Sequence, residues 1–485
     1  MFKTMKKSFL WIVSLLLVFP SLRAENIGVP SECEDVMLQA FYWDSYKLTK
    51  YGRTKWESLM KDTAAINANF DLVWFPPSAS STGGVGYYHA CLTNQNSEWG
   101  DTNSLTSLIK ALHDGGTKVI GDIVINHRGN KSTWCDFWED DFTQLYGGKF
   151  QLTEEHICSN DECFTTSSSA CYGSSTHGAA DTGTNDGGCR DLDHSNEYVQ
   201  KWAKTYLKWM LKRMKYDGFR YDMTRGYHGR YLSMYNEAAK PYFSVSEYWE
   251  GIDATVGHLK ATNYNTLIFD FPLKYSLGTA LLTNNLRALI NPSNSLRGKG
   301  YSKYAVTFID NHDTFERSDN QSGEFIGYNI NLQDSINKNK ILQANAYILM
   351  LPGVPCVFWP HWKSYPDEIN ELIALRKLAG IHSESAVLSE TCNSNVYEIK
   401  VQGHRGVIIL RMGQTRSKEA PEGFYVAIEG GGTANYTIFA QNGTGINNVN
   451  SDSSKSKGEK FVKDGRLFIR VGEREYDAHG RLIQK

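Results

Sequence analysis

The sequence has no large excess of charge, no long apolar run beyond its first residues and no phosphate-binding glycine motif. Its formal net charge is −2 over 485 residues, so the basic surface that binds nucleic acid is not indicated. After residue 24, no stretch approaches the ~20 apolar residues that a membrane helix needs. Neither G-x-G-x-x-G nor G-x-x-x-x-G-K-[ST] occurs, so a nucleotide site is not indicated. We expect no nucleic-acid partner and no stable membrane insertion.

The first 24 residues have the pattern of an export signal. Lysines precede an apolar run from Phe9 to Phe19, and Ala24 is a small residue suited to cleavage. The run is too short to span a bilayer comfortably. We therefore expect a signal peptide over residues 1–24 and a secreted or periplasmic protein.

Nine cysteines in an exported chain permit disulfides. Five of them fall within one loop-like region: Cys135, Cys158, Cys163, Cys171 and Cys189. No C-x-x-C pair is present, which disfavours a zinc site built from these five but leaves it as the alternative to disulfides. The odd total leaves at least one thiol unpaired.

From Val36 to about residue 382, strand-like apolar runs alternate with amphipathic helical stretches. The expected strands are Val36–Trp43, Phe70–Phe75, Lys118–Ile125, Gly218–Asp222, Tyr242–Glu247, Thr266–Asp270, Ala305–Asp310 and Val354–Phe358. The expected helices are Trp56–Ile66, Leu105–His113, Glu197–Lys215, Tyr231–Ala239, Leu273–Leu289, Asn337–Leu349 and Asp367–Leu378. This alternation predicts an α/β fold, a parallel (β/α)8 barrel rather than an open doubly wound sheet.

Two segments depart from the alternation. Residues 128–190 are rich in Gly, Ser, Thr, Asp and Cys, which predicts a loop-rich insert domain after strand three. Beyond residue 382 the chain has short strands separated by Gly and Asn turns, which predicts an antiparallel all-β domain. Its expected strands are Val396–Val401, Gly406–Met412, Gly423–Ile428, Tyr436–Phe439 and Lys460–Val471. The expected domains are a barrel over 25–127 and 191–382, an insert over 128–190 and a C-terminal domain over 383–485.

Acidic residues occur at the predicted carboxyl ends of the barrel strands, where barrel enzymes carry their chemistry. Asp222, Glu247 and Asp313 each follow a different apolar run. Two carboxyl groups, one ionised and one protonated, are the minimum for hydrolysis of a glycosidic bond. The three acids therefore indicate a glycoside-cleaving site.

Arg220 and Asp222 lie two positions apart on one predicted strand, so their side chains share a face. The guanidinium should lower the pKa of Asp222 and keep it ionised, as a carboxylate nucleophile requires. An ordinary strand-end ion pair is the alternative for this pair. Glu247 is flanked by apolar residues such as Val245 and Trp249, a setting that should keep a proton available on it.

Four motifs carry a family resemblance. They are residues 122–127 (DIVINH), 218–222 (GFRYD), 246–249 (SEYW) and 308–313 (FIDNHD). In this order they resemble the four signature regions of the alpha-amylase family of glycoside hydrolases. Residues 36–44 (VMLQAFYWD) and 352–356 (PGVPC) make the chain most similar to plant-type members.

The resemblance implies a role for each matched residue. Asp222 would be the nucleophile, Glu247 the general acid/base and Asp313 the third acid that supports both. The implied contacts to the sugar are Tyr87, His127, Arg220, Trp249 and His312. Plain packing is the alternative role for the two aromatic residues of this set.

The resemblance also implies a calcium site where the insert meets the barrel. Its implied ligands are Asn126, Asp181, Asp191 and the carbonyl of Gly226, and calcium prefers such oxygen donors. Many members have a histidine at the position of Gly226, so this glycine resembles the plant-type pattern. Solvated loop acids are the alternative for the two aspartates, and the insert's cysteines are not part of the usual plant pattern.

The favoured hypothesis is an endo-acting alpha-amylase that hydrolyses α-1,4 bonds of starch, glycogen and maltooligosaccharides with retention of configuration. A glucan transglycosylase is an alternative, because it would start from the same covalent intermediate. A non-catalytic glucan-binding relative is the alternative from another class, and the presence of all three acids disfavours it. We expect a monomer that binds Ca²⁺, and residues 443–485 have no functional interpretation.

Overall fold

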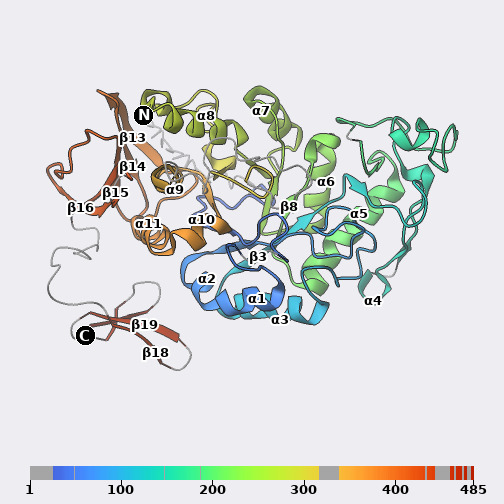
Figure 1. The fold of residues 1–485 in the computed structure, drawn as a ribbon, viewed down its shortest axis with the longest axis horizontal. Helices are drawn as coiled ribbons and strands as arrows, with labels where there is room; N and C mark the ends of the chain where they lie inside the picture. The colour runs from blue at the N-terminus through green and yellow to red at the C-terminus, as the bar shows by residue number, and fades with distance from the viewer. Residues whose placement is uncertain are drawn as a thin grey trace, which may run out of the picture.

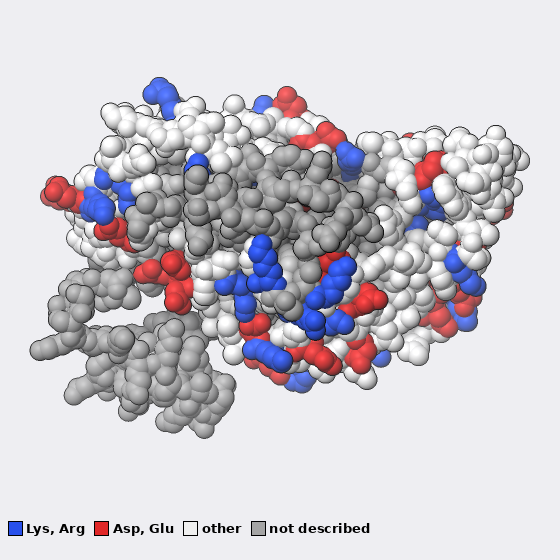
Figure 2. Space-filling view, viewed as in Figure 1, with Lys and Arg blue, Asp and Glu red and all other residues white. Residues whose placement is uncertain are grey.

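The computed structural model describes residues 26–47, 50–146, 148–185, 187–315, 338–431 and 434–442, together with the backbone of four strands between residues 459 and 484. The predicted signal peptide over residues 1–24 lies outside the described residues. Within them, no helix is both long enough and apolar enough to cross a membrane. On the face shown in Figure 2, acidic and basic side chains are intermixed over the described surface, in keeping with the small net charge.

Eight short strands form a closed parallel barrel (Figure 1). They are β1 (Met37–Gln39), β2 (Leu72–Trp74), β3 (Lys118–Ile123), β8 (Gly218–Tyr221), β9 (Phe243–Ser246), β10 (Leu267–Phe269), β11 (Ala305–Phe308) and β12 (Val354–Phe358). Strands that follow one another in this series pair in parallel, and β1 closes the ring by pairing with β12. The predicted (β/α)8 barrel is therefore confirmed, with strands shorter than expected.

Helices surround the barrel (Figure 1). They are α1 (Trp56–Leu59), α2 (Thr63–Asn69), α3 (Thr102–Asp114), α5 (Glu197–Trp209), α6 (Gly229–Ala239), α7 (Ile252–Ala261), α8 (Phe271–Leu282), α9 (Lys338–Met350), α10 (Trp359–Ser364) and α11 (Pro366–Ala379). Helix α3 illustrates how they form. The Asp101 carboxylate caps its first turn by accepting from the Ser104 N–H at 2.7 Å. Four apolar residues from Leu105 to Leu112 then bury one face at helical spacing.

The helix α7 was not among the predicted helices. It buries only three side chains, Thr255, His258 and Leu259, so its sequence carries little of the apolar periodicity that reveals a helix. Conversely, the expected helix over 273–289 ends at Leu282 and is followed by a separate 3₁₀ turn, Leu286–Leu289.

The insert after β3 is built mainly of loops. It contains β5 (Asp140–Asp141), β6 (Lys149–Phe150) and α4 (Thr143–Tyr146), and its two ends pair as β4 (His127–Arg128) and β7 (Arg190–Asp191). A fully buried ion pair, Arg128 Nη1 to Asp140 Oδ2 at 2.8 Å, anchors it.

A disulfide links two of the insert's five cysteines, Cys135 and Cys171. The sulfur of Cys163 lies within 4.8 Å of both sulfurs of that bond. The other two, Cys158 and Cys189, are buried thiols. A single zinc site that uses all five cysteines is therefore not formed.

The C-terminal domain is antiparallel, as predicted. Its five-stranded sheet has the order β13-β14-β15-β17-β16, with β13 (Ala386–Asn393), β14 (Val396–Gln402), β15 (Val407–Met412), β16 (Phe424–Glu429) and β17 (Tyr436–Gln441). A further sheet contains β18 (Glu459–Lys463), β19 (Arg466–Val471), β20 (Arg474–Asp477) and β21 (Leu482–Gln484). The strand β13 was not predicted, because all but one of its side chains are at least partly exposed.

Candidate active site

Arg220 lies at the centre of a group of acids at the carboxyl ends of adjacent barrel strands. Its Nη1 donates to Oδ1 of Asp222 at 2.7 Å and to Oδ1 of Asp122 at 2.8 Å. Its Nη2 lies 2.8 Å from Oε1 of Glu247. All four side chains are buried. Because β3, β8 and β9 are neighbours in the barrel, these side chains converge on one guanidinium.

The electrostatic balance of this group differs from the prediction for Asp222. Burial raises its pKa, Arg220 lowers it, and the nearby Glu247 and Asp122 carboxyls raise it again. The net result is a pKa well above the usual range for aspartate, so the expected lowering was wrong. Burial also raises the pKa of Asp122, against the effect of Arg220. One arginine thus faces several buried acids, and the group as a whole favours retention of a proton.

The surroundings of Glu247 are not the apolar ones that the sequence predicted. Its neighbours in sequence are apolar, but its carboxyl group points away from them. Oε1 meets Arg220, and Oε2 accepts a hydrogen bond from the backbone N–H of Met223 at 2.9 Å. Met223 has a φ of 44°, a left-handed conformation that is uncommon for methionine and typical of functional sites. The setting of Glu247 is therefore polar.

A relay of hydrogen bonds holds His312 and Tyr87 beside the acids. Gln39 Nε2 lies 3.0 Å from Nδ1 of His312, and Nε2 of His312 lies 2.7 Å from the Tyr87 hydroxyl. The hydroxyl donates to Oδ2 of Asp122 at 2.9 Å. Because the Gln39 amide N–H donates to Nδ1, the proton of neutral His312 resides on Nε2. Nε2 also lies 3.0 Å from Oδ2 of Asp313.

Two aromatic rings lie parallel to His312. The rings of Trp43 and Tyr87 are both within 5° of its plane, with centroids 6.0 and 5.4 Å away. Trp43 follows β1 and was not among the predicted site residues. Its position just past a barrel strand was the signal that could have found it.

Asp222, Glu247 and the rings beside them line a cavity of about 730 Å³ at the carboxyl end of the barrel. Seven of the eight predicted catalytic and substrate-binding residues line it: Tyr87, His127, Asp222, Glu247, Trp249, His312 and Asp313. Arg220 is not part of the wall, because it lies beneath the carboxylates and is 1% exposed. The residues that were not predicted are Trp43, Tyr88, Gly187, Gly188, Cys189, Met223, Arg225 and Glu250.

The insert supplies one wall of this cavity, through residues 187–189. Glu162 holds that segment: its Oε1 accepts from the Gly188 N–H at 2.6 Å and from the guanidinium of Arg190. Asp161 accepts from the Asp191 N–H at 2.9 Å. Neither acid was predicted, because nothing in the irregular sequence of the insert marks which loop residues meet.

Three of the four predicted calcium ligands, Asn126, Asp191 and Gly226, lie together, and the turn that carries the fourth, Asp181, packs beside them. Asn126 Nδ2 donates to Oδ1 of Asp191 at 3.0 Å, and the turn that begins at Asp181 packs against residues 225–226 through the Thr184 N–H and the Arg225 carbonyl, 2.9 Å apart. A Cβ added to Gly226 would lie 2.0 Å from Oδ1 of Asn126. Only glycine therefore fits there, and the side-chain oxygens and backbone carbonyls of this set are donors that suit Ca²⁺.

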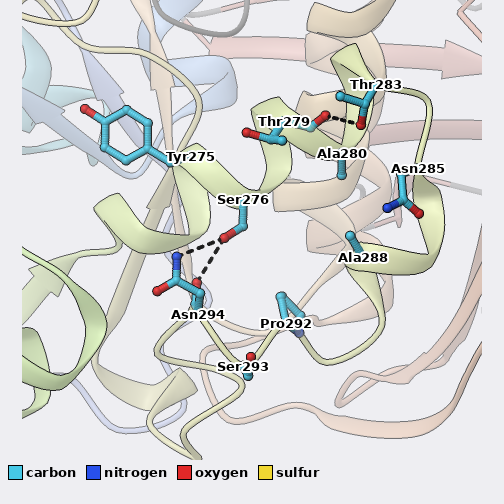
Figure 3. Close-up of a pocket in the computed structure, with 10 residues that line it drawn as sticks. All are labelled: Tyr275, Ser276, Thr279, Ala280, Thr283, Asn285, Ala288, Pro292, Ser293 and Asn294. Atoms are coloured by element: carbon cyan, nitrogen blue, oxygen red, sulfur yellow. Dashed lines mark hydrogen bonds between the residues drawn. The ribbon is translucent and has the colours of Figure 1, made fainter.

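Trp249 connects the cavity to a second hollow on α8. Its ring stacks on Phe271 with centroids 4.7 Å apart, and its Nε1 donates to the hydroxyl of Tyr275 at 3.0 Å. Figure 3 shows the hollow that Tyr275 borders, where Asn294 Nδ2 donates to the Ser276 hydroxyl. It has a volume of about 350 Å³ and no acidic residue in its lining. The candidate catalytic acids therefore line the first cavity and not this hollow.

A parallel barrel whose carboxyl end brings three buried acids onto one arginine, with Asp313 lining the same cavity, has the paired carboxyl groups that the class of glycoside hydrolases requires. The chain matches the family described as "Alpha amylase, catalytic domain" over residues 67–361. It belongs to the alpha-amylase family.

Two plant proteins and one solved structure illustrate the likeness. The chain is 30% identical to alpha-amylase 3, chloroplastic, of Arabidopsis thaliana over 82% of its own length, but spans only 43% of that protein. It is also 30% identical to the probable alpha-amylase 2 of the same plant, over 75% of this chain and 85% of that one. The crystal structure of an Anoxybacillus alpha-amylase shares the fold, with a TM-score of 0.60, 15% identity and coverage of 84% and 98% of the two chains. The predicted likeness to plant-type members is confirmed.

Proposed function

We propose that this protein is an endo-acting alpha-amylase that hydrolyses α-1,4-glucosidic bonds of starch, glycogen and maltooligosaccharides with retention of configuration. The observation that carries the proposal is the contact of Asp222 and Glu247 with the two Nη atoms of one guanidinium. Shared contact holds two carboxyl groups close together. A retaining mechanism needs a separation of ~5–5.5 Å, whereas an inverting one needs a wider gap for water.

In the first step, an ionised Asp222 attacks the anomeric carbon while Glu247 gives a proton to the leaving glycosidic oxygen. The bond to the leaving sugar breaks, and a glycosyl ester forms on Asp222. In the second step, Glu247 takes a proton from water, which attacks the same carbon and frees Asp222. Arg220 keeps both groups aligned, and its charge opposes the rise in the pKa of Asp222, which favours the ionised nucleophile that this step requires.

The rest of the cavity suits a neutral sugar. Asp313 and His312 lie at its wall as acceptor and donor for hydroxyl groups, with His312 oriented by Gln39. The partly exposed rings of Trp43, Tyr88 and Trp249 offer flat apolar surfaces to sugar faces. A polysaccharide is thus bound by hydrogen bonds and ring contacts together.

Calcium is part of this proposal. Asn126, Asp181, Asp191 and the Gly226 carbonyl would hold the ion, which would neutralise the acids and tie the insert to the barrel. The proposal also includes export by residues 1–24 and a monomeric state. Sequencing the N-terminus of protein recovered outside the cytoplasm tests the first, and light scattering tests the second.

The experiment that tests the reaction is a proton NMR time course on maltoheptaose with Ca²⁺ present. Early appearance of the α anomer at the new reducing end supports retention, and early β anomer overturns it. An Asp222→Asn variant should abolish the signal, whereas Asp253→Asn, at an exposed site on α7, should not. Products longer than the substrate would instead indicate transfer, and absence of new reducing ends would favour glucan binding without catalysis.

A further inference from the structure

A second group of possible metal ligands lies at the opposite end of the barrel from the active site. Glu32 lies ahead of β1, His382 follows α11, and His404 is in the turn between β14 and β15. One ligand atom from each lies within 4.8 Å of the other two. Three segments that are far apart in sequence, one of them from the C-terminal sheet, therefore meet at this point.

The spacing within the group suits a small metal ion. His404 Nε2 lies 3.4 Å from Oε2 of Glu32, close to the ~3.3 Å between two ligands that are each 2.0–2.1 Å from a tetrahedral zinc ion. The two imidazole rings stack with centroids 4.1 Å apart. Because an imidazole nitrogen binds a metal ion in the plane of its own ring, one of the two stacked rings must turn before both reach the same ion. Glu32 and His404 are exposed, which leaves their side chains free to reorient.

A carboxylate already orients His404. Oε1 of Glu34 lies 2.9 Å from Nδ1 of the ring, and Arg405 in turn holds Glu34 by two hydrogen bonds. A carboxylate on one ring nitrogen leaves the other nitrogen as a metal ligand, and this arrangement recurs around protein-bound zinc. Nε2 of His404, which faces Glu32, is therefore the ligand atom.

The backbone beneath His404 is also fixed. Its N–H donates to the Gly380 carbonyl at 2.9 Å, and the Arg405 N–H donates to the Ala379 carbonyl at 3.0 Å. These carbonyls belong to the C-terminal end of α11, which carries a partial negative charge that favours a cation. The backbone that carries His404 is thus held in place before any ion binds.

His382 is the weaker partner. It is buried, and its Nδ1 accepts a long hydrogen bond, 3.3 Å, from the Glu384 N–H. A metal on Nδ1 would displace this bond, and a metal on Nε2 would require Nδ1 to carry the proton. Either way the bond is lost, so binding should be moderate rather than tight.

We propose that Glu32, His382 and His404 form a site for a divalent transition metal ion of the zinc class, which ties the C-terminal sheet to the base of the barrel. Two imidazoles and one carboxylate favour Zn²⁺, Ni²⁺ or Co²⁺ over Ca²⁺, which prefers oxygen ligands alone. The three ligands come together only when barrel and C-terminal sheet are both folded and docked. Bound metal should therefore raise the unfolding temperature.

The test is a calorimetric titration of NiCl₂ into the full-length protein, purified without a histidine tag and with Ca²⁺ present. Ni²⁺ is chosen because it discriminates better than Zn²⁺ against the insert's thiols. The variants are His404→Gln, which can keep a hydrogen bond to Glu34, and Glu32→Gln. The matched control is His113→Gln, because His113 also pairs with a carboxylate, Asp217 at 2.8 Å, but has no second histidine in its described surroundings.

We expect one Ni²⁺ per chain, with a dissociation constant ~10-fold or more higher in His404→Gln and unchanged in His113→Gln. Ni²⁺ should raise the unfolding temperature of the unaltered protein and of the control, but not that of His404→Gln. The three proteins should unfold at similar temperatures without metal, which separates ligand loss from misfolding. No binding to the unaltered protein, or equal binding to His404→Gln, overturns the proposal and leaves a simple ion-pair network.

Discussion

Nη2 of Arg220 lies 2.8 Å from Oε1 of Glu247, while Nη1 of the same side chain contacts Asp222 and Asp122. The arginine is therefore a partner of the candidate acid as well as of the candidate nucleophile. One delocalised cation shared in this way fixes the relative positions of the two reacting groups, which a pair of separate contacts would not do.

Replacing Arg220 by lysine tests this relationship. A lysine ammonium is a point charge without the planar fork, so it cannot bridge Asp222 and Glu247 in the same geometry. We expect kcat on soluble starch to fall by roughly 10²–10⁴-fold. The matched control is Arg230→Lys, at an exposed position on α6, which should retain activity. A kcat within a few-fold of the unaltered protein in Arg220→Lys would show that bridging is not needed.

A buried acid outside the cavity predicts a pH dependence of stability. Burial raises the pKa of Asp270 to about 7 from its usual 3.8, against hydrogen bonds from the Leu273 and Leu296 N–H groups. Between these values the folded protein holds a proton that the unfolded chain has released. Stability from this group is therefore lost as pH rises from ~4 to ~7, by up to about 4 kcal/mol.

Urea unfolding at pH 5 and pH 8 measures this effect. In an Asp270→Asn variant, the free energy of unfolding should differ less between pH 5 and pH 8, because this residue no longer titrates. The variant should be less stable than the unaltered protein at pH 5, because one backbone N–H would face the amide NH₂. The exposed Asp253 provides a control, since Asp253→Asn should keep the full difference in free energy of unfolding between the two pH values. If the free energy of unfolding changes equally with pH in Asp270→Asn and in the unaltered protein, Asp270 is not the cause of the pH dependence.

Much of the fold could be predicted because each barrel strand is a buried apolar run with its polar residues at one end. Because barrel enzymes carry their catalytic residues at the carboxyl ends of the strands, Asp222, Glu247 and Asp313 could be predicted to meet, and they line one cavity. The neighbours of a residue in the sequence did not predict its surroundings where contacts between distant segments decide them. Glu247 has apolar neighbours in sequence, but Arg220 and the Met223 N–H surround its carboxyl group.

Elements with weak burial patterns could not be predicted. The helix α7 buries three residues and β13 is mostly exposed, so neither shows clear periodicity. The contacts of Glu162 and Cys135 within the insert depend on how irregular loops fold together, which no local spacing encodes. A family motif can predict such a contact where the family has one, as for Asn126 and Gly226.

The close approach of Gly226 to Asn126 predicts a response to calcium. In Gly226→Ala, the added Cβ would lie 2.0 Å from Oδ1 of Asn126, so the candidate ligand must move, at a cost of about 1–3 kcal/mol. We expect weaker Ca²⁺ binding by calorimetry and a lower unfolding temperature that EGTA barely changes. EGTA should lower the unfolding temperature of the unaltered protein clearly.

Gly257 provides the control for that variant. It lies within α7, and a Cβ there would meet nothing within 4 Å. Gly257→Ala should therefore be neutral or stabilising by up to about 1 kcal/mol, with Ca²⁺ binding intact. If both alanine variants bind Ca²⁺ as the unaltered protein does, the ion is not held at Asn126 and Gly226.

The contact between Glu162 and residues 188–190 predicts that the insert controls substrate binding. Glu162→Ala removes the acceptor of the Gly188 N–H and the partner of Arg190, so the cavity wall at 187–189 loses its support. We expect kcat/KM on maltoheptaose to fall by roughly 10-fold or more, mainly through KM, because the wall positions substrate and not the reacting acids. Glu155→Ala, at an exposed site in the same insert, should behave like the unaltered protein. A fall in kcat at constant KM would instead mean that the disturbance reaches Asp222 or Glu247.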